Sequence, residues 1–270
     1  MEKRLHKAHF QLTDRCNLSC RFCGQTRGML ASTHQELSPE IWLRAADELR
    51  VAAEGCGFPP EIMLWGGEPL LYSKFDELAS ELHRLGFKLG IVTNGTLLDR
   101  HAQTICETLD EIFVSMDGIG EVHDSSRGKG VFEKVKKNLA LFRNRRGKLV
   151  FLASVSDCNV RGISQLPYAF ARELCPDEVV LGQLMYLAPK EIGEYREYSR
   201  RHLGCDYPEL NGWRREDDDK YLAVLKEEKE KIAMERYPLP VYFMPHTYPE
   251  SPVAHHCGNA WTRVHIRHDG

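Results

Sequence analysis

The amino-acid sequence predicts an α/β protein whose parallel strands and helices form a partial (β/α)6 TIM-like barrel. Two observations lead to this fold class. Short β-type runs alternate with longer stretches of helical periodicity from about residue 8 to residue 185, and such alternation is typical of parallel sheets. Six units of this kind favour an open or partial barrel, with its active site at the carboxyl ends of the strands.

Six runs are predicted to be the strands of this barrel, and helical segments lie between them. The clearest helices span residues 74–85 and 131–142, because their apolar side chains recur every three or four positions and therefore share one face. The predicted strands are residues 9–13, 62–65, 88–93, 111–115, 149–155 and 178–183.

The pattern changes after residue 190, where two helices and an irregular segment are predicted. Residues 191–203 form one helix and residues 214–235 a highly charged second one, whose runs EDDDK and KEEKEK are interpreted as a solvated face. Five prolines between residues 238 and 252 then indicate an irregular connection. The predicted division is a core barrel, a helical linker and a C-terminal extension, at residues 1–190, 191–240 and 241–270.

The composition is that of a soluble protein and excludes two classes of partner. With 28% charged residues and a net charge of -3, the chain lacks the basic excess that is typical of nucleic-acid binding. No run approaches the about 18 apolar residues of a membrane helix, and the polar start MEKRLHKAH lacks the apolar run of a signal peptide. We therefore expect a cytoplasmic protein with no nucleic-acid and no membrane partner.

The chain contains 9 cysteines at uneven spacing. An odd count disfavours a complete disulfide framework and favours thiolate ligands in a reducing compartment. Four of them are scattered and are expected either to pack in the core as small apolar side chains or to be incidental, namely Cys56, Cys106, Cys158 and Cys175. Cys205 is less easily assigned to such a role.

Three further cysteines follow the first predicted strand directly, in the segment TDRCNLSCRFCGQ. Cys16, Cys20 and Cys23 share one strand-end loop with the spacing C-x3-C-x2-C, so three soft ligands can converge on a single cluster. Because Fe–S clusters normally take four cysteines, a site with three leaves one iron open to a chelating substrate. The alternative is a zinc site completed by a residue such as His34, although zinc ligands usually come as two C-x2-C pairs.

The second predicted strand ends in the motif LWGGEP. Gly66 and Gly67 lack a Cβ atom, so a ligand can approach the backbone closely. Glu68 offers a carboxylate that can accept hydrogen bonds from an ammonium group, and Pro69 completes the motif. The alternative interpretation is a purely structural Gly-Gly turn after a strand.

Small polar residues close the third and fourth predicted strands. Asn94 lies in VTNG, and Ser115 and Asp117 lie in VSMDG, at the edge where a barrel builds its site. Arg127 follows in HDSSRGKGVF, and its forked guanidinium group suits a carboxylate ligand. An arginine of a surface loop is the alternative for this residue.

The cysteine loop, with Phe22 just before its last cysteine, resembles the signature of the radical S-adenosylmethionine (SAM) superfamily, and the resemblance extends along nearly the whole chain. It implies a [4Fe-4S] cluster on Cys16, Cys20 and Cys23. The open iron of this cluster would be chelated by the amino and carboxylate groups of SAM. Phe22 would lie along the adenine ring.

The same resemblance implies roles for the other motifs. The GGEP element would bind the amino group of SAM, and Ser115 and Arg127 would hold its carboxylate. Ser154 and Asn159 are candidate ribose contacts, with an ordinary polar turn as the alternative. The implied SAM-binding residues are Phe22, Gly66, Gly67, Glu68, Pro69, Asn94, Ser115, Asp117, Arg127 and Ser154.

The C-terminal segment HHCGNAWTRVHIRHDG resembles the opening of the auxiliary-cluster domain called SPASM, or of its shorter relative called twitch. In such domains the first cysteine is followed by a hairpin, a glycine and a second cysteine. Cys257 and Gly270 match the first part of this pattern. We therefore expect Cys257 to be a metal ligand, an auxiliary Fe–S cluster only in a longer native chain, and one cluster in the 270-residue form.

The resemblance implies reductive cleavage of SAM to a 5′-deoxyadenosyl radical that abstracts hydrogen from a substrate. The leading expectation is oxidative modification of a peptide or protein, by crosslinking or dehydrogenation, with a reductase such as flavodoxin or ferredoxin as partner. The short segment before the first strand suggests no N-terminal leader-recognition domain. The alternatives are a small-molecule substrate, such as a cofactor precursor or aminosugar, and a non-catalytic Fe–S or zinc sensor, which would not need the GGEP element.

Overall fold

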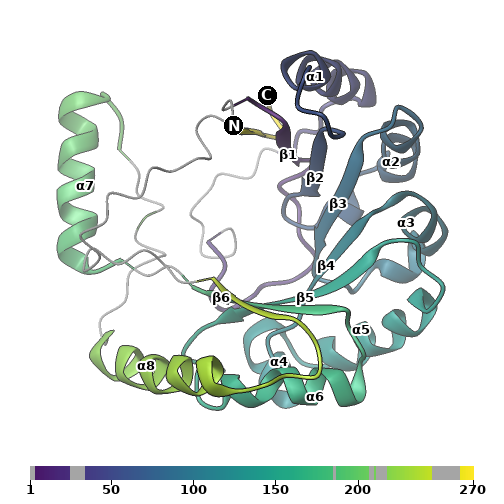
Figure 1. Ribbon diagram of the computed structural model, residues 1–270. Helices are drawn as coiled ribbons and strands as arrows, with labels where there is room; N and C mark the ends of the chain where they lie inside the picture. The colour runs from purple at the N-terminus through teal and green to yellow at the C-terminus, as the bar shows by residue number, and fades with distance from the viewer. Residues whose placement is uncertain (1–3, 25–33, 185–186, 207–209, 211–217, 245–261) are drawn as a thin grey trace.

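One curved sheet of parallel strands dominates the computed structural model (Figure 1). The structure describes residues 4–24, 34–184, 187–206, 210, 218–244 and 262–270. Within them the strand order is β7-β6-β5-β4-β3-β2-β1-β8, and each neighbouring pair is parallel. The strands are β1 (Lys7–Gln11), β2 (Glu61–Trp65), β3 (Lys88–Thr93), β4 (Glu111–Ser115), β5 (Lys148–Val155), β6 (Glu178–Gln183), β7 (Val241–Met244) and β8 (Arg263–Ile266).

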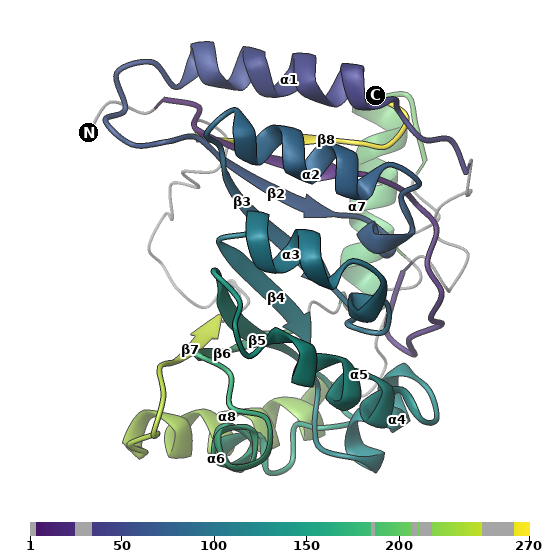
Figure 2. The same ribbon diagram turned by 90° about the vertical axis from the view of Figure 1, so that its right-hand side faces the viewer.

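Helices cover the convex face of this sheet, and α7 stands apart on the open side of the barrel (Figures 1 and 2). None of the described helices is both long and apolar enough to cross a lipid bilayer. The α-helices are α1 (Pro39–Ala52), α2 (Phe75–Arg84), α3 (Ala102–Thr108), α4 (Glu121–Arg127), α5 (Val131–Leu139), α6 (Leu166–Glu173), α7 (Pro189–His202) and α8 (Asp218–Met234). The 3-10 helices are η1 (Pro69–Leu71), η2 (Leu98–Arg100), η3 (Ala140–Phe142) and η4 (Ile163–Gln165).

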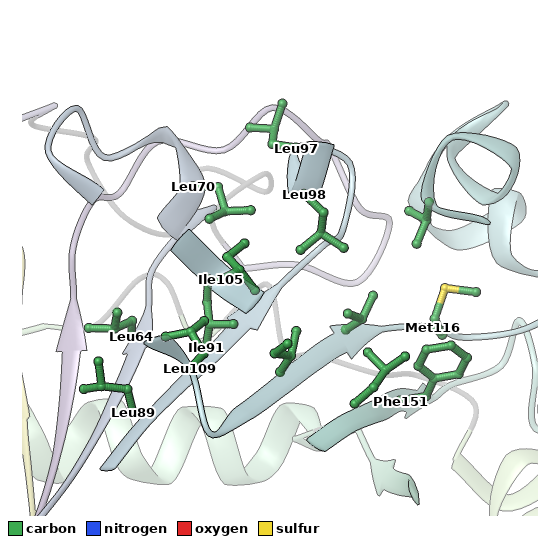
Figure 3. Close-up of a cluster of buried hydrophobic side chains, with 14 of the residues drawn as sticks. Leu64, Leu70, Leu89, Ile91, Leu97, Leu98, Ile105, Leu109, Met116 and Phe151 are labelled. Atoms are coloured by element: carbon green, nitrogen blue, oxygen red, sulfur yellow. The ribbon is translucent and has the colours of Figure 1, made fainter. Parts of the chain in front are cut away.

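The hydrophobic core lies between the sheet and these helices. Alternate side chains of each strand point to opposite faces, and β2 accordingly alternates between buried and partly exposed residues. Figure 3 shows Leu64, Leu89 and Ile91 of the strands beside Ile105 and Leu109 of the α3 region. Burying each such side chain stabilises the fold by about 1.5–3 kcal/mol. This layer holds the strands in register and therefore fixes where their carboxyl ends lie.

All six predicted strands are present, and the described residues contain two further strands. β7 extends the sheet beside β6, and β8 extends it beside β1. β1 begins two residues before the predicted span 9–13, because Lys7 and Ala8 already pair with β2 and with β8. Both edge strands therefore come from the part of the sequence that was predicted as a C-terminal extension.

Helix α8 packs against the barrel through specific polar contacts. Tyr221 donates its hydroxyl hydrogen to the carbonyl oxygen of Val155 at 2.9 Å. The buried carboxylate of Glu228 accepts hydrogen bonds from the backbone N–H and the hydroxyl of Ser164, at 3.0 and 2.7 Å. The prediction of a solvated face is therefore wrong at Glu228, because η4 presents two donors to a carboxylate within the charged run.

Charged side chains of alternating sign lie along the amino ends of the strands. Lys7 lies 2.6 Å from Glu61, Glu61 lies 3.4 Å from Lys88, and Lys88 lies 3.2 Å from Glu111. These side chains are partly exposed, so each pair contributes about 0–1 kcal/mol. The opposite, carboxyl edge of the sheet carries the residues predicted for the functional site.

Candidate functional site

The loop of residues 12–24 leaves the carboxyl end of β1 and carries three cysteines; we call it the cluster loop. β1 is fixed below it by Phe10, whose ring stacks on Trp42 of α1 with centroids 4.8 Å apart. The backbone N–H of Arg21 donates to the carbonyl oxygen of Ser126 at 2.8 Å. The loop is thereby held by α4 as well as by its parent strand.

The three thiols lie at different depths on the cluster loop. Cys16 is exposed, Cys23 is partly buried and Cys20 is buried, and the Cys23 N–H donates to the Cys20 carbonyl at 3.0 Å. Burial raises the pKa of the Cys16 thiol and raises that of Cys20 to about 11. Metal ions overcome this penalty because coordination deprotonates a thiol outright. Three soft donors on one loop, two of them poorly ionised alone, fit an iron–sulfur cluster.

The two glycines of LWGGEP allow the turn after β2 to touch the cluster loop. The Gly67 N–H donates to the Thr13 carbonyl at 2.9 Å, and the Glu68 N–H donates to the Arg15 carbonyl at 2.7 Å. A Cβ atom at Gly66 would lie 2.4 Å from the Thr13 oxygen, and one at Gly67 would lie 2.1 Å from the Arg15 oxygen. The chain itself makes the close approach that these glycines permit, and a SAM contact at Gly66 or Gly67 stays a prediction.

Glu68 is 0% exposed and accepts three hydrogen bonds from the chain. Thr93 Oγ1 donates to Oε1 at 2.6 Å, the Asn94 N–H donates to Oε2 at 2.8 Å, and the Leu70 N–H donates to Oε1 at 3.2 Å. Burial outweighs these bonds and raises the pKa of Glu68 to about 7. A carboxylate has about four acceptor positions, so one position on Oε2 stays uncommitted. Thr93 was not predicted, although it directly precedes Asn94 in VTNG.

Asn94 joins the end of β3 to the cluster loop. Its Nδ2 donates to Asn17 Oδ1 at 3.0 Å and lies 4.0 Å from Cys16 Sγ. Its Oδ1 accepts from the Thr96 N–H at 2.9 Å, and Asn17 Nδ2 donates to Thr96 Oγ1 at 2.8 Å. The amide group of Asn94 is thus oriented by β3 and placed beside a cluster-loop sulfur.

Asp117 and Arg127 form a buried ion pair, with side chains that are 1% and 8% exposed. Arg127 Nε donates to Oδ2 at 2.6 Å and Nη2 donates to Oδ1 at 3.1 Å. Ser126 Oγ and the Ser154 N–H donate to the same carboxylate, at 3.0 and 2.8 Å. These four bonds fill the about four acceptor positions of Asp117. In the structure Asp117 holds Arg127, and its predicted contact with SAM stays a prediction.

The guanidinium group of Arg127 is also directed at the cluster loop. Its Nη1 lies 3.9 Å from Cys20 Sγ, and its central carbon lies 5.4 Å from the ring centroid of Phe22. The positive charge lowers the pKa of Cys20 and so opposes the effect of burial. The fork that was predicted for the SAM carboxylate is already engaged by Asp117, which leaves Nη1 for the cluster loop.

The family assignment follows from residues 10–155, which match the family model described as the Radical SAM superfamily. This match covers more than half of the chain and includes the three cysteines of the cluster loop, Glu68 and the Asp117–Arg127 pair. The chain belongs to the radical SAM superfamily. Members of this superfamily use a [4Fe-4S] cluster and S-adenosylmethionine. The resemblance that was predicted from the cysteine loop is therefore confirmed.

The names of proteins similar to this radical SAM chain indicate different substrates. It is 35% identical over 158 residues to the Fe-coproporphyrin III synthase of Methanosarcina barkeri, over 57% of this chain and 38% of that protein. It is 29% identical over 159 residues to the sporulation killing factor maturation protein SkfB of Bacillus subtilis, over 58% of this chain and 37% of that protein. The chain thus spans well under half the length of these two relatives.

The fold is shared with Streptococcus suis SuiB, a structure of which is bound to S-adenosylmethionine. The TM-score is 0.67 at 16% identity, and the match covers 99% of this chain and 59% of SuiB. SuiB was also solved bound to the precursor peptide SuiA, with a TM-score of 0.65 and 15% identity. This likeness confirms the predicted fold class.

The serines predicted as SAM contacts of the radical SAM site lie at two neighbouring strand ends. Ser115 ends β4 and is buried, and Ser154 lies near the end of β5. Asn159 Nδ2 donates to the carbonyl oxygens of Asp117 and Ser154, at 2.8 and 3.0 Å. Both amide hydrogens of Asn159 are therefore engaged, and the polar-turn alternative holds for this residue.

The structure also decides some of the remaining predictions. Pro69 is buried at the start of η1, beside Glu68. Cys106 packs against the core, whereas Cys175 is exposed and belongs to the incidental alternative. Cys257 lies outside the described residues.

Proposed function

We propose that this chain is the core of a radical SAM enzyme that cleaves SAM reductively and begins hydrogen abstraction from a substrate. The observation that carries this proposal is the buried polar frame around the cluster loop, built from the ends of β2, β3 and β4. Cys16, Cys20 and Cys23 hold the cluster. When bound, the cluster and SAM supply the radical chemistry, in which one electron splits SAM into methionine and a 5′-deoxyadenosyl radical.

The residues around the loop are assigned to binding and orientation. Glu68 keeps one acceptor position on a buried carboxylate, which suits the ammonium group of SAM. Phe22 would lie along the adenine ring, and the hydroxyl groups of Ser115 and Ser154 would bind polar parts of SAM. Asn94 and Arg127 hold donors beside the sulfur atoms of the loop. Burial of this frame excludes water from the reacting groups.

We assign the substrate to the class of peptides or proteins, modified oxidatively by crosslinking or dehydrogenation. The names of two similar proteins support this class: SkfB is a maturation protein, and SuiB was solved with a precursor peptide. A small-molecule substrate is the second candidate, since the Fe-coproporphyrin III synthase is also similar to the chain.

Anaerobic reconstitution with iron and sulfide, followed by SAM and dithionite or a reduced flavodoxin or ferredoxin, tests the chemistry. We expect 5′-deoxyadenosine from the wild type and from the Cys175→Ala control. The combined Cys16→Ala, Cys20→Ala and Cys23→Ala variant is expected to form none, because the cluster lacks its ligands. Formation at the wild-type rate by this variant would remove the proposal.

Mass spectrometry of candidate substrates tests the substrate class. Peptides encoded beside the gene are expected to lose hydrogen atoms in a reaction that depends on SAM and on the three cysteines. Fe-coproporphyrin and its precursors serve as the competing small-molecule set. Conversion within that set, with every peptide unchanged, would transfer the assignment to the second candidate.

We further propose that Cys257 belongs to a SPASM- or twitch-like unit that begins within the predicted extension at residues 241–270. The predicted core at 1–190 and linker at 191–240 precede this extension, whose strands β7 and β8 join the sheet of the core. In this arrangement Cys257 binds an auxiliary cluster together with cysteines of a longer chain. Iron quantitation on the reconstituted 270-residue chain is the test. About four irons per chain are expected for one [4Fe-4S] cluster, and twice that content, halved by Cys257→Ala, would show that the present sequence holds both.

A further inference from the structure

We propose that His268 is a positioning residue of the cluster site, which holds the cluster loop through Asp14. This inference deepens the proposed function, since the loop it concerns is the proposed ligand loop. It gives β8, which His268 follows, a role at the cluster site that no sequence motif indicated. The inference rests on the pairing of β8, on the burial of His268 and on the way the loop is held from two sides.

Strand β8 is fixed directly beside the strand that leads into the cluster loop. It pairs with β1 in parallel, in a register that runs from Lys7↔Arg263 to Phe10↔Ile266. The backbone N–H of His6 donates to the carbonyl oxygen of Thr262 at 3.1 Å, which starts the pairing. Because parallel strands keep the same direction, the residues after β8 emerge beside the residues after β1 (Figure 2).

The turn after β8 directs one histidine inward. Arg267 points outward and pairs with Asp269, with both nitrogen–oxygen distances at 3.0 Å. His268 is only 3% exposed, and its Nε2 lies 3.4 Å from Oδ2 of Asp14. Asp14 is itself well buried and stands two residues before Cys16. A buried carboxylate in the cluster loop is thus in polar contact with the end of β8.

The cluster loop is therefore held from two sides at the same place. On the β2 side, backbone hydrogen bonds from Gly67 and Glu68 hold the carbonyl groups of Thr13 and Arg15. On the β8 side, His268 faces the side chain of Asp14, the residue between these two. The Asp14 carboxylate also accepts a hydrogen bond from the His34 N–H at 3.2 Å. Removing the β8 contact takes away one of these supports at Asp14, while the β2 turn still holds Thr13 and Arg15.

Hydrogen exchange on the 270-residue chain before cluster assembly tests the contact without any cofactor. In His268→Ala we expect the amides of residues 13–16 to exchange about tenfold faster, because a contact to a charged group is lost. His268→Gln, which keeps a nitrogen donor of similar reach, is expected to restore most of the protection. Arg267→Ala, an exposed neighbour on the same turn, is the control and is expected to leave the loop unchanged.

The same variants are then reconstituted anaerobically and challenged with an iron chelator. Loss of an outer contact to a ligand loop is expected to speed iron release about tenfold in His268→Ala, with Arg267→Ala at the wild-type rate. The double variant, Asp14→Ala with His268→Ala, is expected to release iron at about the same rate as Asp14→Ala alone, because the two residues act as one unit. The midpoint potential of the cluster is expected to move in His268→Ala and to return in His268→Gln.

These outcomes separate the inference from the proposed function. Unchanged exchange at residues 13–16 in His268→Ala would overturn the inference, even if the wild type assembles a cluster normally. Faster exchange that extends equally to β3, β4 and β5 would also overturn it, because His268 would then stabilise the whole sheet. A wild-type chain that binds no iron would remove the proposed function, whereas the exchange result in the metal-free chain would still stand.

Discussion

The amino and carboxyl edges of the sheet both carry ionic side chains, but they differ in burial and in what the charges contact. At the amino edge, Lys88 and Glu111 are 40% and 31% exposed and pair only with their neighbours along the edge. At the carboxyl edge, Asp117 and Arg127 are almost completely buried and reach the cluster loop. Pairs of acidic and basic side chains therefore form a solvated surface at the amino edge and a fixed, buried frame at the carboxyl edge.

The difference shows why only one edge builds a site. Exposed pairs are screened by water and contribute about 0–1 kcal/mol each, so their loss changes little. In a buried ion pair, hydrogen bonds hold both side chains in place, and removal of one partner leaves an uncompensated charge. Such a frame keeps its geometry without a ligand, which is the property that a binding site needs.

Among the substitutions that test this contrast between the two edges, Asp117→Ala is expected to change stability most. The change leaves the Arg127 guanidinium group buried without its carboxylate, and we expect the free energy of unfolding to fall by about 3–5 kcal/mol. Denaturant unfolding under anaerobic conditions measures it. A loss below about 1 kcal/mol would show that removing an ion pair at the carboxyl edge costs no more stability than removing one at the amino edge.

A second effect is the pH dependence that arises from Glu68. Its folded pKa of about 7 lies above the ordinary value of 4.5, so the folded chain binds the proton more tightly than the unfolded chain. The contribution of Glu68 to stability is therefore fully present below pH 4.5 and is lost as the pH rises towards 7, by about 3 kcal/mol. Unfolding of the wild type and of Glu68→Gln between these values measures it, and a constant difference between the two would contradict the prediction.

Glu68→Gln itself is expected to weaken the frame at a fixed acidic pH. In the wild type, the surrounding donors reach both side-chain oxygens of Glu68. Glutamine has only one side-chain oxygen, so the N–H of Asn94 or of Leu70 loses its acceptor. We expect a loss of about 1.5–3 kcal/mol in unfolding free energy. We also expect weaker SAM binding, with the absorption of the cluster retained. The control is Glu77→Gln on the exposed face of α2, which should change neither quantity.

The smallest effect is expected at the amino edge. Lys88→Ala removes two partly exposed pairs, with Glu61 and Glu111, and should lower the free energy of unfolding by at most about 1 kcal/mol. High salt should reduce the effect further, because exposed charges are screened. A loss that matches Asp117→Ala would break the contrast between the two edges.

Much of the fold was predictable because its signals are local. Short β-type runs marked all six inner strands, and β3, β4 and β6 match their predicted bounds. The edge strand β7 escaped prediction because it is four residues long and lies among prolines, whereas the segment of β8, which alternates like a strand, was predicted to belong to an auxiliary-cluster domain. Their pairing depends on the sheet edges that β6 and β1 present, which no local pattern records.

The candidate site divides in the same way. The spacing of Cys16, Cys20 and Cys23 on one loop is a property of the sequence alone, so these residues could be predicted as cluster ligands without any tertiary contact. The partners of Glu68 were not predictable: Thr93 reaches it across 25 positions of the chain. A hydrogen bond between two strand ends requires the register of the sheet, which exists only in the folded chain.

The sequence by itself determined the parallel α/β class, the cluster loop and the positions of the polar strand ends. Only the tertiary structure decided that Asp117 holds Arg127, that Gly67 admits the cluster loop and that His268 faces Asp14. The physical reason is distance along the chain. Periodicity and spacing act over a few residues, whereas buried polar groups are satisfied by whichever donors and acceptors the packed sheet brings to them.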